Sequence, residues 1–368
     1  MAEKTFFFAG GGTGGHIYPA IAVAEKIKKL SPDAGIHFFA STRAVDKNIL
    51  DKSLFSYSQL PATGLSLKPS ALIKFFTNFS KSQKIATEKL LNSPNPVVIG
   101  TGGFVAAPVC KAAHKLKIPV MLINTDYIPG KANRFLARYS DRIFTQFTET
   151  ADYLPKFAAR IEAVGCPLRE AFEKPDGAAA IKDLALDSQK KILLITGASS
   201  GSASINQTIT SLLGELEKFA DTWQIVHIAG AADFENVKAK YSAATIKNTV
   251  IAYYHDMPSL LCAAELIIGR SGAVSVAEYA AVAKPVICMP YPHHKDRHQY
   301  FNASPLVEKG TCIIVDDVPD AGDRAGWLMD ELTPLLSGGD ELKEMQNACL
   351  TLPKNTASDT IARYLLSL

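Results

Sequence analysis

The first half of the chain alternates short apolar runs with longer segments in which apolar residues recur at helical spacing. Short apolar runs bounded by Gly, Pro and polar residues predict buried strands, and the longer segments predict helices. Such an alternation is typical of a parallel sheet with helices on both faces. The predicted strands are residues 5–9, 36–40, 97–99, 120–123, 142–145 and 161–164, and the predicted helices are residues 20–30, 70–91, 105–115 and 131–139.

The same pattern restarts near residue 191, and 368 residues exceed one typical domain. We therefore predict an α/β protein of two doubly wound, Rossmann-like domains, residues 1–165 and 166–349. Ligands of open parallel sheets bind at the carboxyl ends of the strands, so we expect the two sheets to face each other across a cleft. The second half adds predicted strands over 191–196, 224–229, 250–253, 266–269, 285–289 and 312–315, a helix over 203–216, and a helical segment over 341–368 with a break near Pro353.

A glycine-rich loop follows the first strand: Gly10-Gly11-Gly12-Thr13-Gly14-Gly15-His16. Glycines let a loop turn sharply and bring its backbone N–H groups close to a ligand, and the N-terminus of the next helix favours negative charge. We expect Pro19 to start that helix. Three of the glycines also satisfy G-x-G-x-x-G, the dinucleotide fingerprint, which is a weak signal when it stands alone.

The dinucleotide fingerprint does not explain His16. An imidazole beside an anion-binding loop can act as a base or can orient a hydroxyl. The alternative is a helix N-terminal residue that bonds to its own backbone. The local sequence does not decide between these two interpretations.

A second small-residue segment lies in the C-terminal half. Residues 269–278 follow a predicted strand and open a predicted helix, which suits phosphate or sugar contacts through backbone N–H groups. Glu278 can bind the two hydroxyls of a ribose, or it can simply complement the helix dipole. The polar loop over residues 290–299 is placed for recognition, and the spacing of its three histidines fits no tight metal-ligand pattern.

Composition indicates a soluble globular protein, with 47% apolar and 20% charged residues. No apolar run is long enough to span a membrane, and the N-terminus does not fit a signal peptide. The six cysteines form no C-x-x-C pair, and we interpret them as reduced core residues of a cytosolic protein. Residues 1–165 hold 21 basic and 11 acidic residues, whereas residues 166–368 hold 18 and 25, so the basic half favours an anionic partner.

No acidic residue occurs between Asp51 and Glu88. Apolar residues with interleaved lysines in this stretch suit a surface that enters lipid and pairs with anionic headgroups. The alternative is an ordinary core helix with a basic edge. The residues that would contact a membrane are Leu65, Leu67, Leu72, Ile73, Lys74, Phe75, Phe76 and Phe79.

Taken in order, these segments resemble the peptidoglycan N-acetylglucosaminyltransferases, a GT-B family within glycosyltransferase family 28. The resemblance runs from the first strand to about residue 315. It rests on residues 11–16, Gly102-Gly103-Phe104, residues 165–169, the Ser199 loop with Asn206, Arg270 through Glu278, and residues 290–303.

The resemblance implies transfer of GlcNAc, with inversion, from UDP-GlcNAc to the MurNAc C4 hydroxyl of an undecaprenyl-pyrophosphate-linked acceptor, at the cytoplasmic face of the cell membrane. It implies an acceptor-binding and membrane-facing N-terminal domain, joined by the C-terminal helix over 350–368, and a donor-binding C-terminal domain. An anionic membrane surface and other cell-wall synthesis proteins are the implied partners. No cofactor, resident metal or nucleic acid is implied, and the need for a divalent cation stays open.

The resemblance also assigns roles by position. His16 is the implied base or orienting group, with Asp126 as a second candidate. The implied substrate-binding residues are Thr13, Gly14, Gly15, Asn124, Asp126, Arg169, Ser199, Tyr254, Ala273, Val274, Ser275, Glu278 and Gln299.

The chain departs from the family where His-Glu-Gln-Asn is usual, because Ile123-Asn124-Thr125-Asp126 stands there instead. This change motivates a second hypothesis, a related GT-B transferase with another lipid acceptor, such as a diacylglycerol galactosyltransferase. A third hypothesis is an NADP-dependent oxidoreductase in which Ser41 and Arg43 hold a 2′-phosphate. A nucleotide-sugar binder without catalytic activity is a fourth.

Overall fold

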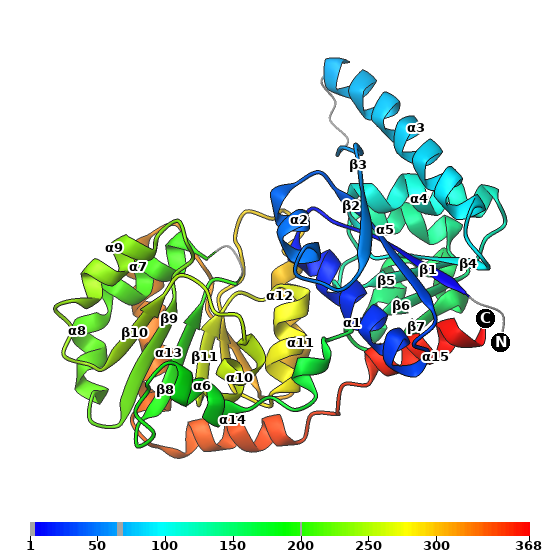
Figure 1. Cartoon of the computed structure of the whole chain (residues 1–368). Helices are drawn as coiled ribbons and strands as arrows, with labels where there is room; N and C mark the ends of the chain where they lie inside the picture. Colours follow the sequence, from blue (N-terminus) through cyan, green and yellow to red (C-terminus); the bar gives the residue numbers. More distant parts are fainter. Residues whose placement is uncertain (1–3, 65–68, 199–200) are drawn as a thin grey trace. The chain divides into compact units, whose positions relative to one another are not determined.

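The computed structural model describes residues 4–64, 69–198 and 201–368. The chain divides into two compact units, which we call unit 1 (Met1–Glu170 with Asn355–Leu368) and unit 2 (Ala171–Lys354) (Figure 1). Each unit contains one parallel sheet with helices packed against it. The prediction of two doubly wound α/β domains is confirmed.

Unit 1 holds a seven-stranded sheet of order β3-β2-β1-β4-β5-β6-β7. The central strand β1 pairs in parallel with β2 and β4, and Phe7 lies opposite His37 and Val98. The strands are β1 (Thr5–Ala9), β2 (Gly35–Ser41), β3 (Ser56–Leu60), β4 (Pro96–Gly100), β5 (Val120–Asn124), β6 (Arg142–Thr145) and β7 (Ile161–Ala163). The α-helices are α1 (Gly14–Leu30), α2 (Ala44–Leu50), α3 (Pro69–Leu91), α4 (Gly103–Lys115), α5 (Lys131–Leu136) and α15 (Ala357–Ser367).

Alternate side chains of β1 fill two separate cores in unit 1, because successive residues of a strand point to opposite faces. Phe6 and Phe8 pack with α1 and α15, whereas Phe7 and Ala9 pack with α3, α4 and α5. The C-terminal helix α15 lies against α1, and the Tyr364 ring meets the Phe144 ring edge-on at 5.4 Å between centroids.

The start of α1 corrects the sequence prediction. We expected Pro19 to begin this helix, but α1 begins at Gly14 and Pro19 lies inside it. Pro19 has no N–H, so the carbonyl of Gly15 lacks its usual helical donor. His16 therefore lies in the first turn of the helix and not in the loop before it. The short helix α2 and the polar edge strand β3 were not predicted.

Unit 2 holds a six-stranded parallel sheet of order β10-β9-β8-β11-β12-β13. The strands are β8 (Lys191–Thr196), β9 (Trp223–Ile228), β10 (Asn248–Ile251), β11 (Leu266–Gly269), β12 (Val286–Cys288) and β13 (Cys312–Ile314). The α-helices are α6 (Gly177–Asp183), α7 (Ala203–Ser211), α8 (Leu213–Leu216), α9 (Phe234–Tyr241), α10 (Met257–Ala263), α11 (Ala273–Ala281), α12 (His298–Glu308), α13 (Ala321–Leu336) and α14 (Asp340–Leu350).

One large core in unit 2 joins the sheet to α7, α8, α9, α13 and α14. Trp223 lies fully buried in it, and its indole N–H donates to the Leu336 carbonyl at 3.0 Å. The helix predicted over 203–216 is interrupted at Leu212, and β10 lies two residues earlier than predicted. The break predicted near Pro353 separates α14 from α15.

Candidate active site

The strand order of unit 1 reverses between β1 and β4, so the loops after these two strands form a topological switch point, where open parallel sheets bind ligands. The side chain of Asp46, which is fully buried, holds the glycine loop after β1 through hydrogen bonds. Both carboxylate oxygens accept from the Gly12 N–H at 2.9 Å, and Oδ2 accepts from the Ser41 N–H at 2.9 Å. Sequence reasoning missed Asp46, because it lies on a helix of only seven residues.

At two positions of this switch point, neighbouring atoms come so close to the backbone that only glycine fits. A Cβ on Gly11 would lie 2.2 Å from Asp46 Oδ2. A Cβ on Gly103, where φ is +73°, would lie 2.4 Å from the Gly11 carbonyl oxygen. Because backbone and carboxylate atoms cannot yield at such distances, the loops after β1 and β4 fit together only with glycine here.

The Ser41 and Arg43 side chains bind within the protein at this point. The Ser41 hydroxyl donates to Asp46, and Arg43 Nη1 donates to the Gly12 carbonyl at 3.1 Å while its guanidinium lies 5.2 Å from the Phe104 ring centroid. Since Asp46 also places a buried carboxylate beneath the loop and occupies the Gly12 N–H, this arrangement does not favour a nucleotide phosphate here.

The imidazole of His16 is half-buried and has a defined orientation. Its Nδ1 lies 3.2 Å from the Gly11 carbonyl oxygen and 3.3 Å from the exposed Thr13 hydroxyl. Because a carbonyl can only accept, the Nδ1–H must donate to it, and the neutral ring then carries its lone pair on Nε2. The reading of His16 as a residue that bonds to its own backbone is therefore confirmed, and its possible role as a base stays a prediction.

The loop after β5 places Asn124 and Asp126 differently. Asn124 is fully buried, donates through Nδ2 to the Asp126 carbonyl at 2.6 Å, and accepts at Oδ1 from Asn133 Nδ2 at 2.8 Å. Asp126 itself is half-buried. The Asn124 side chain thus joins the β5 loop to α5, and Asn133 is a residue that sequence reasoning did not select.

In unit 2 the strand order reverses between β8 and β11. The helix α11 begins directly after β11, so Ala273, Val274 and Ser275 occupy its first turn and Glu278 lies half-buried about one turn further on. The Ser271 hydroxyl just before the helix is buried, with no hydrogen-bond partner among the described residues. These positions bring together the predicted donor-binding residues of this segment.

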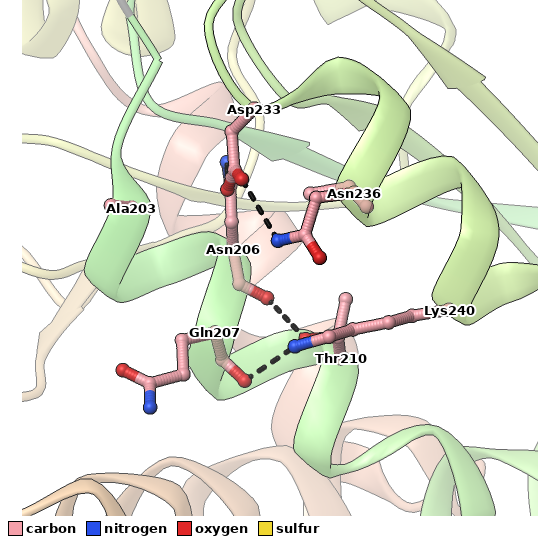
Figure 2. Close-up of a pocket in the computed structure, with 8 residues that line it drawn as sticks. Ala203, Asn206, Gln207, Thr210, Asp233, Asn236 and Lys240 are labelled. Carbon is pink, nitrogen blue, oxygen red and sulfur yellow. Dashed lines mark hydrogen bonds between the residues drawn. The ribbon is translucent and has the colours of Figure 1, made fainter.

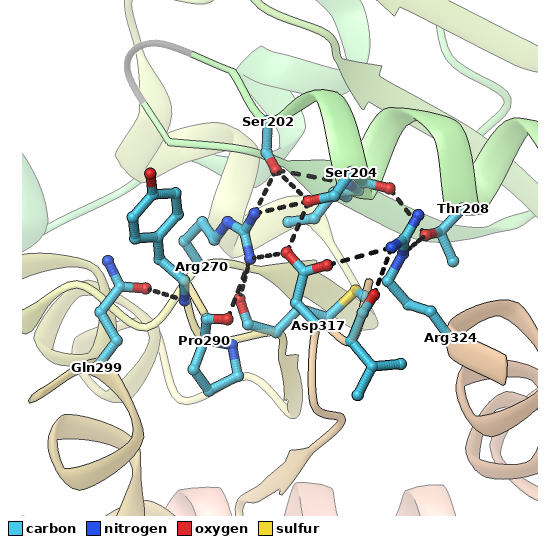
Figure 3. Close-up of polar contacts among 12 residues, drawn as sticks. Ser202, Ser204, Thr208, Arg270, Pro290, Gln299, Asp317 and Arg324 are labelled. Atoms are coloured by element: carbon cyan, nitrogen blue, oxygen red, sulfur yellow. Dashed lines mark hydrogen bonds and ion pairs between the residues drawn. The ribbon is translucent and has the colours of Figure 1, made fainter. Parts of the chain in front are cut away.

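A buried arginine–aspartate cluster, Arg270, Asp317 and Arg324, ties together the loops at the carboxyl edge of the unit 2 sheet (Figure 3). Arg270 Nη1 lies 2.7 Å from Asp317 Oδ2 and donates to the Met289 carbonyl at 2.7 Å. Arg270 Nη2 donates to the hydroxyls of Ser202 at 2.7 Å and Ser204 at 2.8 Å. Both Nη atoms of Arg270 are thus engaged in joining four loops.

The other predicted residues of the donor site are placed as follows. The Gln299 side chain accepts from the Tyr291 N–H at 2.9 Å and fixes the loop between them (Figure 3). The Tyr254 hydroxyl donates to Asp183 at 2.9 Å, and burial together with this carboxylate raises the pKa of Tyr254 to about 12. Arg169 belongs to unit 1, where its guanidinium lies 4.8 Å from the centroid of the Tyr18 ring. Ser199 lies outside the described residues.

A polar pocket of about 290 Å³ opens between α7 and α9 (Figure 2). Asn206 is almost fully buried beside it and donates to the Ala229 carbonyl and to Asp233 at 2.9 and 2.8 Å. The pocket lies along the helices, and its lining includes none of the predicted site residues. The lining residues are Ala203, Asn206, Gln207, Thr210, Asp233, Asn236, Val237 and Lys240.

The first half of α3 carries six of the predicted membrane residues and extends away from α4 and the sheet of unit 1 (Figure 1). Ile73 and Phe76 are 68% and 61% exposed, Lys74 is exposed, and Leu72, Phe75 and Phe79 are half-buried. Leu65 and Leu67 lie outside the described residues. The second half of α3 packs into the core through Ala86 and Leu90.

Within residues 4–64, 69–198 and 201–368, every helix is too short or too polar to span a lipid bilayer. In the same residues, no three or more His, Cys, Asp or Glu side chains are grouped so that they could hold a metal ion.

Comparison with known families identifies both halves of the chain. The model of the glycosyltransferase family 28 N-terminal domain matches residues 6–145, and that of the C-terminal domain matches residues 192–361. The chain belongs to glycosyltransferase family 28. This assignment confirms the resemblance found in the sequence and makes the protein a glycosyltransferase.

Family 28 relatives are similar over nearly the whole chain. An enzyme of Halalkalibacterium halodurans is 32% identical over 96% of both chains, and one of Alkaliphilus metalliredigens is 33% identical over 98% of both. Both are named UDP-N-acetylglucosamine--N-acetylmuramyl-(pentapeptide) pyrophosphoryl-undecaprenol N-acetylglucosamine transferase. The crystal structure of Acinetobacter baumannii MurG has a TM-score of 0.71 over the full length of both chains at 23% identity, which supports the GT-B fold.

Proposed function

We propose that this family 28 enzyme transfers GlcNAc from UDP-GlcNAc to the MurNAc C4 hydroxyl of undecaprenyl-pyrophosphoryl-MurNAc-pentapeptide, a step of peptidoglycan synthesis. The observation that carries the proposal is the full-length similarity to enzymes named for this reaction. The comparisons favour neither another lipid acceptor nor an NADP-dependent oxidoreductase. The Asp46 and Arg43 contacts at the glycine loop also argue against the oxidoreductase.

In the proposed reaction, His16 serves as the general base. The C4 hydroxyl oxygen attacks C1 of GlcNAc, the bond between C1 and the phosphate oxygen breaks with its electron pair leaving on UDP, and the hydroxyl proton passes to His16 Nε2. Attack opposite to the leaving group inverts C1. Support comes from the Nδ1–H bond to the Gly11 carbonyl, which leaves the lone pair on Nε2. Thr13, Gly14, Gly15 and the half-buried Asp126 complete the proposed acceptor side.

The donor belongs to unit 2 in this proposal. The backbone N–H groups of Ala273, Val274 and Ser275 in the first turn of α11 suit the pyrophosphate, and a carboxylate at Glu278 suits the two ribose hydroxyls. Gln299 keeps an amide nitrogen with no partner among the described residues for a sugar hydroxyl. Tyr254 is proposed to contact the base through its backbone, and Ser199 and Arg169 to contact phosphate.

Unit 1 is the proposed membrane-facing part, at the cytoplasmic face of the cell membrane, where other cell-wall synthesis proteins would meet it. Support comes from α3, in which Ile73 and Phe76 are exposed beside Lys74. Exposed apolar side chains with adjacent lysines bind anionic bilayers. Replacing Ile73 and Phe76 by Ser should lower co-sedimentation with anionic vesicles and leave it unchanged with neutral ones. Equal binding of the unmodified protein and this double variant to anionic vesicles would refute this role of α3.

Turnover of UDP-GlcNAc with a lipid-linked MurNAc acceptor analogue tests the proposed reaction. His16→Ala should lower kcat by roughly 10²- to 10⁴-fold, the usual contribution of a general base. His114→Ala, which removes an exposed histidine of α4, serves as the control and should leave kcat unchanged. Failure of the folded protein to release UDP with any such acceptor, or greater thermal stabilisation by UDP-Gal than by UDP-GlcNAc, would overturn the proposal.

A further inference from the structure

One buried polar atom of α5 has no hydrogen-bond partner in the part of the chain that the structure describes. Asn133 is 6% exposed, and its Oδ1 has no hydrogen-bond partner among the described residues. Leaving a buried acceptor unpaired costs about 1–3 kcal/mol, so such an atom in a folded protein needs an explanation.

The Asn133 oxygen borders the same small space as the imidazole. A Cβ on Gly102, where φ is +103°, would lie 2.8 Å from Asn133 Oδ1 and 3.2 Å from His16 Nε2. Gly102, which has no Cβ, therefore leaves a space that both atoms border. The His16 nitrogen that borders it is the one that does not bond to the backbone.

The amide of Asn133 cannot exchange its oxygen and nitrogen without loss. Its Nδ2 donates to Asn124 Oδ1 at 2.8 Å, and Asn124 Nδ2 in turn donates to the Asp126 carbonyl at 2.6 Å. Rotating the Asn133 amide by half a turn would bring two oxygens together and break this chain of hydrogen bonds. The two asparagines therefore hold the Asn133 carbonyl oxygen at the space that His16 also borders.

We propose that Asn133 is a positioning residue for His16, and that its Oδ1 stabilises the imidazolium formed when Nε2 takes a proton. A neutral imidazole offers only a lone pair on Nε2, whereas the imidazolium offers an N–H that a nearby carbonyl oxygen can accept. A partner that bonds only to the charged form stabilises that form. Asn124 acts one step further away, by fixing the direction of the Asn133 oxygen. This inference rests on the proposed role of His16 as the base.

Charged groups near His16 stay the same in the variants below, so they cannot produce the expected differences. They are Asp46 and Arg43 beneath the glycine loop, Asp126 after β5, Arg134 on α5 and Arg169 beside Tyr18 of α1.

The test is an NMR titration of His16 in the free enzyme, which needs no turnover. Asn133→Leu removes the oxygen and should lower the His16 pKa by about one unit, the shift expected when a hydrogen bond to a charged group is lost. Asn133→Asp keeps an oxygen there and adds negative charge, so it should raise the pKa. Asn124→Leu releases the Asn133 amide and should produce part of the decrease seen with Asn133→Leu.

Ser82→Ala is the matched control, because it removes another buried, unpaired polar atom of unit 1, on α3. It should leave the His16 pKa unchanged. In active enzyme, the acid limb of kcat/KM against pH should move in the same directions, while the KM for UDP-GlcNAc stays constant. An unchanged His16 pKa in both Asn133 variants would overturn the inference, whereas absence of turnover in the unmodified enzyme would count only against the proposed reaction.

Discussion

The loops at the switch points of the two units are held in place by buried side chains of opposite charge. Each lies where the strand order reverses, and each joins a small-residue loop to the start of a helix. In unit 1 a buried carboxylate, Asp46, holds the loop through its N–H groups. In unit 2 a buried guanidinium, Arg270, holds the loops through hydroxyl and carbonyl oxygens.

This difference determines what each switch point can bind. Asp46 occupies the Gly12 N–H and brings negative charge, so unit 1 is a poor site for a nucleotide phosphate but leaves an imidazole nitrogen available. Arg270 binds hydroxyl and carbonyl oxygens, and the N-cap residue of α11, Gly272, makes no side-chain hydrogen bond to the start of that helix among the described residues, so the N–H groups there suit the anion of the proposed donor. A glycine-rich loop in a Rossmann-like domain is therefore not by itself a phosphate site, because the group that anchors the loop also matters.

The two anchoring residues, Asp46 and Arg270, can be tested separately, because both tryptophans, Trp223 and Trp327, lie in unit 2. Tryptophan fluorescence therefore follows the unfolding of unit 2, whereas far-UV circular dichroism follows both units.

The largest effect is expected for Arg270→Met. This change leaves Asp317 buried, with Arg324 at 3.5 Å as its remaining cationic partner among the described residues. Unpairing a buried ion typically costs about 3–5 kcal/mol. The urea midpoint followed by tryptophan fluorescence should fall accordingly. Replacing Asp317 by Leu in the same protein should recover part of the loss. Arg297→Met, which removes an exposed ion pair, should cost less than about 0.5 kcal/mol. Equal effects of the two arginine changes would show that the cluster does not anchor unit 2.

A smaller effect is expected for Asp46→Ala. It removes the acceptor of the Gly12 and Ser41 N–H groups, at about 1–3 kcal/mol for each group that stays buried and unpaired. The loss should be visible in circular dichroism but not in tryptophan fluorescence, and kcat should fall because the carbonyl that orients His16 belongs to the same loop. Asp51→Asn, at the exposed end of α2, is the control and should change neither signal. A lowered fluorescence midpoint in Asp46→Ala would contradict the assignment of this anchor to unit 1 alone.

The sequence predicted the strands and loops of both switch points because each signal is local. The apolar run over Thr5–Ala9, the glycines after it and the start of α11 can be identified within about ten residues. The anchors could not be found in this way, since Asp46 meets Gly12 across 34 positions and Arg270 meets Ser202 across 68. Asn133 could not be selected from the sequence either. Its proposed role depends on its hydrogen bond to Asn124 and on the absence of a Cβ at Gly102, which lies about 30 positions away. His16 was selected from the sequence, but the tautomer that leaves Nε2 free follows only from the Gly11 carbonyl.

The smallest effect concerns one buried histidine in each unit. Burial lowers the pKa of His37 in unit 1 to about 4, with a further decrease from Lys89, and burial lowers that of His227 in unit 2 to about 3 despite the nearby Asp233. Both values lie below the unfolded value of 6.5, so the unfolded chain binds more protons and each histidine destabilises the fold as the pH falls below 6.5. At pH 5.5 each should cost about 1.4 kcal/mol relative to pH 7.5.

The stability losses caused by the two histidines should differ only below about pH 4. The loss from His37 stops near pH 4, whereas that from His227 continues toward pH 3. His227→Gln should flatten the pH dependence of the fluorescence midpoint, and His37→Gln should flatten only that of the circular dichroism signal. A fluorescence midpoint that keeps its pH dependence in His227→Gln would show that another group titrates in unit 2. The carboxylates at the edge of each sheet would then be the next groups to replace.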